Sequence, residues 1–188
     1  MGTLELREPR PRLFKPEEYL NLVELGTFEN ERVELIRGVI IRMSPLSVFH
    51  DDTVMKLDDL LKEAYGRKRA WVRVQMTFAS VDSRPQPDLV CIDRNLDCSK
   101  AQPKEAFLIV EVADSSLKYD TTIKAELYAE AGVPEYWVVD LKGKQIEVRT
   151  EPKRGAYTTM HLVGFSERIA VPGTKKTLRV SDFLTPKR

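Results

Sequence analysis

The chain alternates short, strongly apolar runs with longer amphipathic stretches, and this alternation limits the folds that it can adopt. The apolar runs extend from Asp88 to Ile92, from Phe107 to Val112 and from Tyr136 to Val139. Runs of this length are typical of strands buried on both faces of a sheet. Between the last two runs, Thr121 to Ala131 carries an apolar stripe at helical spacing. We therefore expect an α/β fold around a central sheet.

The rest of the chain predicts helices before the sheet and strands after it. Gly38 lies in the middle of a β-branched stretch, which indicates two short strands joined by a tight turn. The expected elements are a helix from Pro16 to Gly26, a hairpin from Val33 to Met43, an amphipathic helix from His50 to Tyr65, and strands at Trp71 to Phe78, Gln145 to Thr150 and Tyr157 to Val163. The last two strands form a β-rich C-terminal part.

Length and composition predict one ordinary globular domain. The chain has 188 residues, with 42% hydrophobic and 31% charged residues. We expect a single domain over 1–188, in which Met1 to Arg12 form a flexible leader. This leader is charged and rich in proline, unlike a signal peptide, and no apolar run is long enough to cross a membrane, so we expect a cytoplasmic protein. The net charge of +1 does not by itself indicate a nucleic-acid binder.

Two carboxylates stand beside the apolar runs. Asp88 follows Pro87 at the start of one strand, and Glu111 lies within the next. If the strands are neighbours, both side chains can converge on one hard cation such as Mg²⁺, with Mn²⁺ as a substitute. Such an ion can polarise a phosphodiester and make hydroxide available near neutral pH. On residue types alone an equally weighted alternative is that Asp88 caps a turn and Glu111 pairs with a lysine.

An ordered series of short motifs resembles a known bacterial family. The series is Val33-Glu34-Leu35-Ile36-Arg37-Gly38, Pro87-Asp88, Glu111-Val112-Ala113-Asp114-Ser115-Ser116, then Asp120, Lys124, Tyr128 and Gly132-Val133-Pro134-Glu135-Tyr136-Trp137-Val138-Val139-Asp140. It is similar to the Uma-two family, which is regarded as a restriction-endonuclease branch of the PD-(D/E)xK nuclease superfamily. The resemblance runs from about Phe14 to the strand beyond Asp140.

This resemblance implies a restriction-endonuclease-like mixed sheet flanked by helices. It also implies that Asp88 and Glu111 are the two acids of the PD-(D/E)xK motif and the metal ligands, and that Glu34 is an accessory acid. The sequence departs from the superfamily pattern at Ala113, where the motif lysine is expected. That lysine normally orients the attacking water or stabilises developing charge.

Lys124 is the candidate to replace the missing lysine. It lies on the predicted helix after Glu111, and its long side chain could reach the edge of the metal site. The alternative, weighted about equally, is a solvated helix lysine that pairs with Asp120. Two further residues are possible accessories. Gln75 could orient water or be an exposed strand residue, whereas His50 could contact substrate or carry a proton, with a helix-start or surface role favoured.

The sequence thus predicts a Mg²⁺-dependent endonuclease that hydrolyses DNA. Asp88, Glu111, Lys124 and Glu34 would be its catalytic residues. Two chains could pair as a homodimer to cut both strands, since C₂ dimers are the commonest oligomers. The alternative is a catalytically inactive protein that retains the nuclease fold and binds nucleic acid or a protein partner. Ala113 and the near-neutral charge favour this second interpretation.

Overall fold

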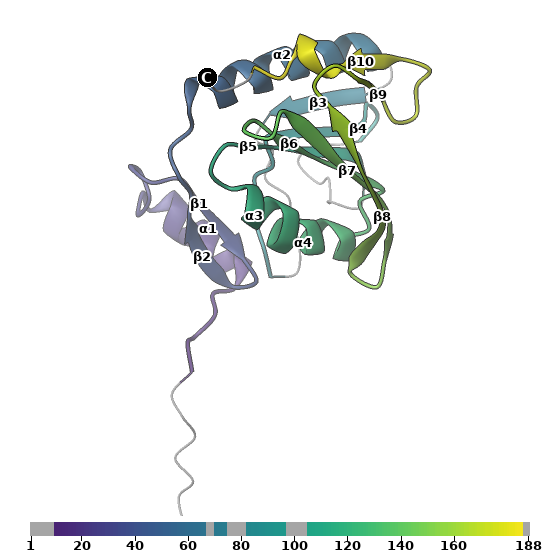
Figure 1. Cartoon of the computed structure of the whole chain (residues 1–188). Helices are drawn as coiled ribbons and strands as arrows, with labels where there is room; N and C mark the ends of the chain where they lie inside the picture. The colour runs from purple at the N-terminus through teal and green to yellow at the C-terminus, as the bar shows by residue number, and fades with distance from the viewer. Residues whose placement is uncertain (1–9, 67–69, 75–81, 97–104, 186–188) are drawn as a thin grey trace, which may run out of the picture.

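A computed structural model of the chain describes residues 10–66, 70–74, 82–96 and 105–185 (Figure 1). A six-stranded sheet forms its centre, in the order β3-β4-β5-β6-β7-β8. The elements are α1 (Pro16–Glu24), β1 (Val33–Ile36), β2 (Val39–Arg42), α2 (Val48–Tyr65), β3 (Ala70–Val74), β4 (Leu89–Asp93), β5 (Ala106–Ala113), α3 (Leu117–Tyr119), the π-helix η2 (Asp120–Lys124), α4 (Ala125–Glu130), β6 (Glu135–Asp140), β7 (Gln145–Lys153), β8 (Ala156–Gly164), β9 (Arg168–Ala170), β10 (Thr177–Arg179) and the 3₁₀-helix η3 (Val180–Asp182).

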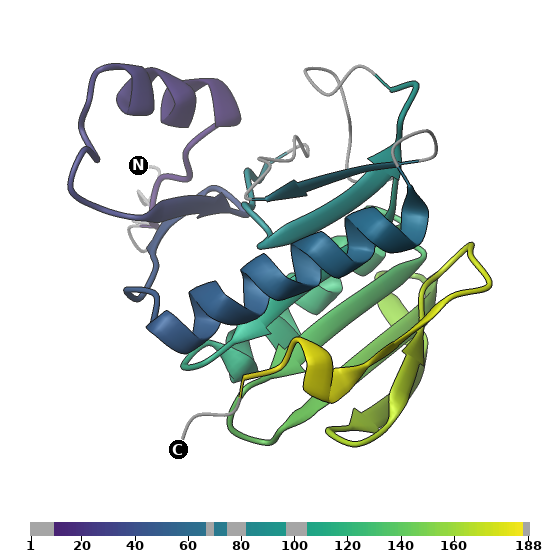
Figure 2. The ribbon, with the colours of Figure 1, turned by 90° about the horizontal axis from the view of Figure 1, so that it is seen from above.

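The central sheet is mixed, because β5 and β6 are parallel and its other neighbouring strands are antiparallel. A parallel pair needs a crossover connection, which α3, η2 and α4 supply. Helix α2 crosses one face of the sheet, and the C-terminal segment lies beside α2 (Figure 2). The expected mixed sheet flanked by helices, with a β-rich C-terminal part, is therefore confirmed.

Alternate residues of the central strands enter two separate cores. Leu89, Cys91 and Val110 pack on the side of α2, together with Phe183 from the C-terminal segment. Residues one position away point to the opposite face and pack against α4; they include Val90, Ile92, Ile109, Tyr136 and Val138. Burial on both faces explains why these strands are almost continuously apolar.

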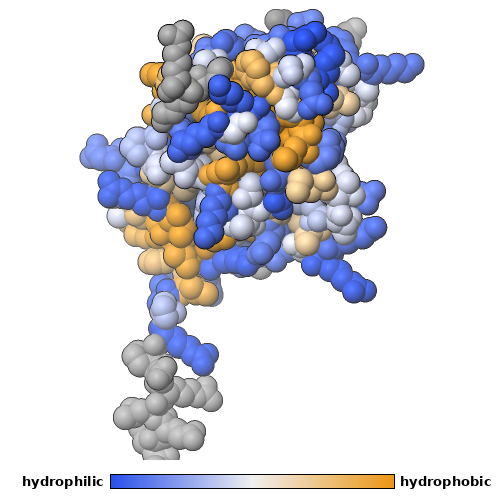
Figure 3. Space-filling model, viewed as in Figure 1, coloured by the Kyte–Doolittle hydropathy of each residue, from blue (hydrophilic) through white to orange (hydrophobic). Residues whose placement is uncertain are grey.

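The hairpin β1–β2 forms a separate two-stranded sheet beside the main one (Figure 1). Its turn residues Arg37 and Gly38 have φ values of 49° and 76°. This left-handed geometry suits a two-residue hairpin turn and favours glycine. A Cβ on Gly38 would lie 2.7 Å from the Leu13 Cβ, so the close approach of the N-terminal segment also requires glycine. On the face in Figure 3, hydrophobic residues gather over and beside this hairpin among mostly hydrophilic surface.

Two expected elements differ from the structure. The helix predicted over Thr121 to Ala131 begins earlier, at Leu117, and contains the π-helical turn η2. The strand predicted over Trp71 to Phe78 is β3, Ala70–Val74, and 75–81 lie outside the described residues. No helix within the described ranges combines the length and apolar character needed to cross a bilayer.

Candidate active site

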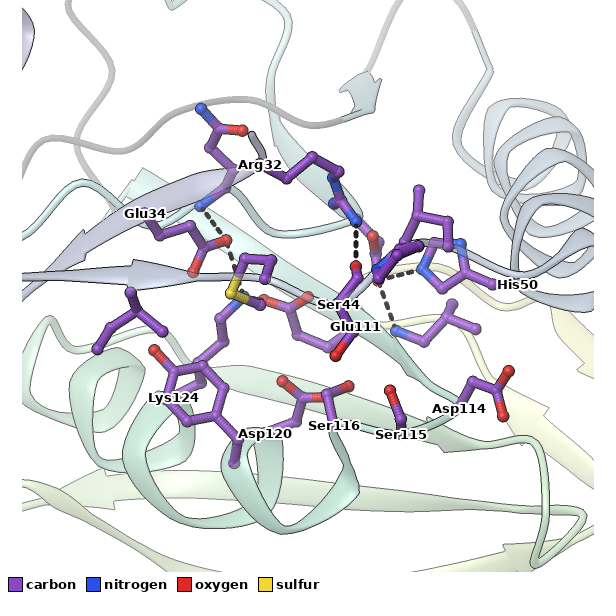
Figure 4. A pocket seen from close by; sticks show the side chains of 18 of the residues that line it. Arg32, Glu34, Ser44, His50, Glu111, Asp114, Ser115, Ser116, Asp120 and Lys124 are labelled. Atoms are coloured by element: carbon purple, nitrogen blue, oxygen red, sulfur yellow. Dashed lines mark hydrogen bonds and ion pairs between the residues drawn. The ribbon is translucent and has the colours of Figure 1, made fainter. Parts of the chain in front are cut away.

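The two carboxylates singled out in the sequence lie in one pocket of about 240 Å³. Asp88 immediately precedes β4, and Glu111 lies on β5. The expectation that these strands are neighbours is confirmed, because they pair antiparallel with Leu89 opposite Val110. In Figure 4, Glu34 reaches the pocket from one side, and Lys124 and Asp120 reach it from the other.

Asp88 is held by donors from two different elements. Its Oδ2 accepts a hydrogen bond from the Val112 backbone N–H at 2.8 Å. His50 Nε2 lies 3.1 Å from the same oxygen. His50 is in the first turn of α2, where its N–H is bonded to the N-cap residue Ser47, and only 5% of the histidine is exposed. The helix-start location is confirmed, but a surface role for His50 is wrong.

The charge state of His50 follows from these contacts. Burial acts to lower the pKa of this imidazole, because a charged ring is poorly solvated there. Hydrogen bonding and attraction from Asp88, and then from Asp51, outweigh burial and raise the pKa above its ordinary value. The ring therefore acts as a hydrogen-bond donor toward Asp88.

Glu111 is held by two side chains from the crossover. Its Oε1 accepts hydrogen bonds from Lys124 Nζ at 2.8 Å and from the Tyr128 hydroxyl at 2.9 Å. Lys124 is 2% exposed, so the alternative of a solvated helix lysine is wrong. The alternative that Glu111 pairs with a lysine does describe a contact in the site, although Glu111 also faces the pocket.

Glu34 is carried into the site by the hairpin. Its Oε1 accepts from Lys124 Nζ and from the Gln86 backbone N–H, each at 3.1 Å. Its Oε2 is buried and has no hydrogen-bond partner among the described residues. Buried carboxylate oxygens rarely lack a partner, so this atom marks a place where a ligand, water or ion would be stabilising. The resemblance placed Glu34 near the metal ligands, and the fold brings it there.

A π-helical turn places Asp120 beside Lys124. The η2 segment begins at Asp120 and ends at Lys124, and both residues are only 2% exposed. Residues four apart lie on one face of such a turn, as they do in an α-helix, and π-helical turns are common at functional sites. Asp120 also accepts a hydrogen bond from the Ser116 hydroxyl. The helical periodicity of the sequence gave no signal for this local change of helix type.

Burial and the crowding of negative charge shift the pKa values of Glu111 and Lys124. Burial raises the pKa of Glu111 well above its ordinary value, Lys124 opposes the rise, and Asp88, Asp120 and Glu34 add to it. For Lys124, burial acts to lower the pKa, but attraction by Glu111, Glu34 and Asp120 prevails and raises it. The ammonium thus stays charged but does not fully offset the surrounding carboxylates.

The donor set fits a hard divalent cation. Asp88 Oδ2 and Glu111 Oε1 are engaged by protein donors, while no described residue donates to Asp88 Oδ1 or Glu111 Oε2. Carboxylate oxygens are the ligands that Mg²⁺ and Mn²⁺ prefer, and Mg²⁺ commonly uses one or two of them together with water. Within the described ranges, no three His, Cys, Asp or Glu side chains are grouped to enclose one ion. Any ion here would therefore keep several waters.

Two further residues contact the site without having been predicted as site residues. Asp120, which lines the pocket, was in the motif series and was the alternative partner of Lys124, whereas Tyr128, which does not line the pocket but bonds to Glu111, was only in the motif series. Their contacts depend on the π-helix and on the pairing of Tyr128 with Glu111 across the fold. Asp114, from the loop after β5, lines the pocket. Gln75 lies outside the described residues.

Replacing Asp120 by asparagine should stabilise the metal-free protein at neutral pH but not in acid. Burial, with Asp88 and Glu34 adding to it, raises the pKa of Asp120 from 3.8 to about 6, against the opposing effects of Lys124 and Ser116. Between these two values the folded protein binds more protons than the unfolded chain, so its stability falls as pH rises through this window. Ionisation of the buried Asp120 lowers the free energy of unfolding by at most about 3 kcal/mol, and this loss is fully present above pH 6.

Urea denaturation in EDTA at pH 4.5 and pH 7.5 measures this effect. The free energy of unfolding of Asp120→Asn should exceed that of wild type by more at the higher pH. Glu126→Gln is a control on α4, because the Glu126 side chain is 56% exposed. Its effect should be equally small at both pH values. An Asp120→Asn effect that does not change with pH would contradict the assigned titration.

Known proteins share both the sequence pattern and the fold of this chain. The model of the family named Uma2, described as "Putative restriction endonuclease", matches residues 16–181. No curated protein matches the chain. A crystal structure of "a putative nuclease belonging to DUF820" from Anabaena variabilis ATCC 29413 has 14% identity and a TM-score of 0.72, and the match covers 93% of this chain and 98% of that chain. This likeness shows a nuclease-like fold, and the family match shows that the chain belongs to the Uma2 (Uma-two) family.

Proposed function

We propose that the protein is a metal-dependent endonuclease that hydrolyses phosphodiester bonds in DNA. The observation that carries this proposal is the excess of carboxylate in the pocket. Among its described lining residues, five acids (Glu34, Asp88, Glu111, Asp114 and Asp120) face three basic side chains (Arg32, Arg42 and Lys124) and His50. Burial raises the pKa of Glu111 and the neighbouring carboxylates add to the rise, and a divalent cation would offset both effects by stabilising the ionised form. The description of the Uma2 family and of the Anabaena protein as nucleases agrees with this chemistry.

Asp88 Oδ1 and Glu111 Oε2 are the oxygens that would hold Mg²⁺ or Mn²⁺. When bound, such an ion polarises the phosphodiester and makes hydroxide available near neutral pH. Glu34 lines the pocket and lies across Lys124 from Glu111, and since no described residue donates to its Oε2, this oxygen would accept a hydrogen bond from an attacking water. Glu34 thus acts as the accessory acid of the site.

Lys124 supplies the fixed positive charge that the motif lysine would otherwise provide. Position 113, where that lysine is expected, holds an alanine that is 1% exposed and packs in the core on the side of α4. The Lys124 ammonium is held at the pocket wall by Glu111 and Glu34. A preorganised charge that is shielded from bulk water stabilises the negative charge that develops on a phosphoryl oxygen.

The mouth of the pocket can attract DNA although its floor is acidic. Arg32 and Arg42 flank the hairpin, line the pocket and are exposed. Arginine forms bidentate hydrogen bonds with phosphate, which dominates affinity for nucleic acid.

Pairing of two chains, with one site for each strand, stays a prediction, as does the cytoplasmic location.

Cleavage of plasmid DNA at controlled metal concentrations tests the proposed function. The wild-type protein should nick or linearise supercoiled plasmid with Mg²⁺ or Mn²⁺ and be inactive in EDTA, because the carboxylates alone cannot generate hydroxide at neutral pH. Readdition of Mn²⁺ should restore cleavage. DNA binding without cleavage under every metal condition would instead support an inactive, nucleic-acid-binding protein.

A further inference from the structure

The two carboxylates assigned to the cation share one pattern of hydrogen bonding. In each, a single oxygen accepts from two protein donors, and no described residue donates to the other oxygen. Asp88 Oδ2 accepts from Val112 N–H and His50 Nε2. Glu111 Oε1 accepts from Lys124 Nζ and the Tyr128 hydroxyl. Because a carboxylate rotates about its last bond, such pairs of donors determine which oxygen faces the pocket.

His50 is well placed to fix Asp88. Its ring is bonded on both nitrogens, with Nδ1 3.3 Å from Asp51 Oδ1 and Nε2 3.1 Å from Asp88 Oδ2. Asp51 is the next residue on α2, and its side chain is 57% exposed. The second acid therefore orients the ring from the solvent side. A histidine oriented in this way can hold the aspartate in one rotamer.

Tyr128 holds Glu111 as His50 holds Asp88. Its side chain is fully buried on α4, and its ring packs against Tyr136 with the centroids 5.1 Å apart. The hydroxyl lies 2.9 Å from Glu111 Oε1. At this distance the phenol O–H is the donor and the carboxylate oxygen the acceptor. Packing of the ring leaves the hydroxyl little freedom to move away.

We propose that His50 and Tyr128 are the positioning residues of the cation site. They hold Asp88 and Glu111 so that Asp88 Oδ1 and Glu111 Oε2 face the pocket together. This inference rests on the proposed function, because it assumes that these two oxygens hold the ion. Partners that orient metal ligands typically contribute about 10- to 100-fold to metal affinity.

Titration with Mn²⁺, followed by electron paramagnetic resonance of the free ion, tests the inference without reference to DNA cleavage. Tyr128→Phe removes only the hydroxyl, and His50→Phe removes both ring nitrogens. Each should weaken Mn²⁺ binding about 10- to 100-fold. His50→Gln retains an N–H donor of similar reach and should bind Mn²⁺ close to the wild-type affinity. If His50→Phe does not fold, His50→Asn, whose amide is too short to reach Asp88, takes its place.

Matched controls separate positioning from a general loss of stability. Tyr157 donates to the Val133 carbonyl at 3.0 Å and does not line the pocket, and His161 is the exposed second histidine, on β8. Tyr157→Phe and His161→Gln should leave Mn²⁺ affinity unchanged even if the melting temperature moves. If Tyr128→Phe and His50→Phe (or His50→Asn) bind Mn²⁺ with the wild-type affinity, the inference is wrong, although the metal site itself is not contradicted. Failure of the wild-type protein to bind Mn²⁺ would overturn the metal site and this inference together.

Discussion

Replacing Asp88 by asparagine should lower the rate of metal-dependent DNA cleavage at least about a hundredfold. Loss of a residue that only orients a metal ligand already costs about 10- to 100-fold, so loss of a charged ligand should cost more. Asparagine has nearly the same shape, and its carbonyl oxygen can still accept from the Val112 N–H. The fold should therefore survive while the charge that attracts the cation is lost.

The measurement is the initial rate of plasmid relaxation at saturating Mg²⁺, with Mn²⁺ affinity determined in parallel. Asp93→Asn is the matched control, since Asp93 is the exposed aspartate at the other end of β4. This control should cleave at the wild-type rate. Cleavage by Asp88→Asn within threefold of wild type would show that Asp88 is not a ligand of the catalytic ion.

Replacing Lys124 by methionine should abolish cleavage and also destabilise the protein strongly. The ammonium is almost completely buried and pairs with Glu111 at 2.8 Å and Glu34 at 3.1 Å. Removal of one partner from a buried ion pair leaves uncompensated charge and costs about 3–5 kcal/mol. The loss should shrink as pH is lowered, because burial raises the pKa of Glu111, Lys124 opposes that rise, and protonation of Glu111 removes charge that the ammonium balances.

Urea denaturation in EDTA measures this cost. Lys118→Met is the control on the same crossover, because Lys118 is exposed, and its effect should stay within about 0.5 kcal/mol. The double substitution Lys124→Met, Glu34→Gln should recover part of the loss, since it removes one of the two unpaired acids. If Lys124→Met costs less than about 1 kcal/mol at pH 7.5, the ion pairs seen here do not contribute as argued.

Hydrophobic periodicity was sufficient to predict most elements of this fold. The apolar runs around Leu89, Ile109 and Val138 correspond to β4, β5 and β6, because strands buried on both faces leave no polar positions. Gly38 identified the hairpin turn because a positive φ is costly for other residues. Helix boundaries were less certain at the crossover, where a π-helical turn has no distinct hydrophobic pattern.

The candidate site was predictable only in part, for a physical reason. Carboxylates beside or within the apolar runs suggested Asp88 and Glu111, and the ordered motif series added Glu34. Long-range contacts decided the rest. His50 was favoured as a helix-start or surface residue, yet α2 packs so that its ring reaches Asp88, 38 positions later in the chain (88 − 50).

By itself, therefore, the sequence determined most of the strands and helices and the two acids beside the apolar runs, because burial patterns are local and periodic, whereas the mixed sheet was implied by the family resemblance. Only the tertiary structure decided that Lys124 is buried between Glu111 and Glu34. Lys124 and Glu34 are 90 positions apart in the chain. It also decided which carboxylate oxygens accept hydrogen bonds from the described residues, since each hydrogen bond depends on the distance and orientation of groups that the chain brings together only when it folds.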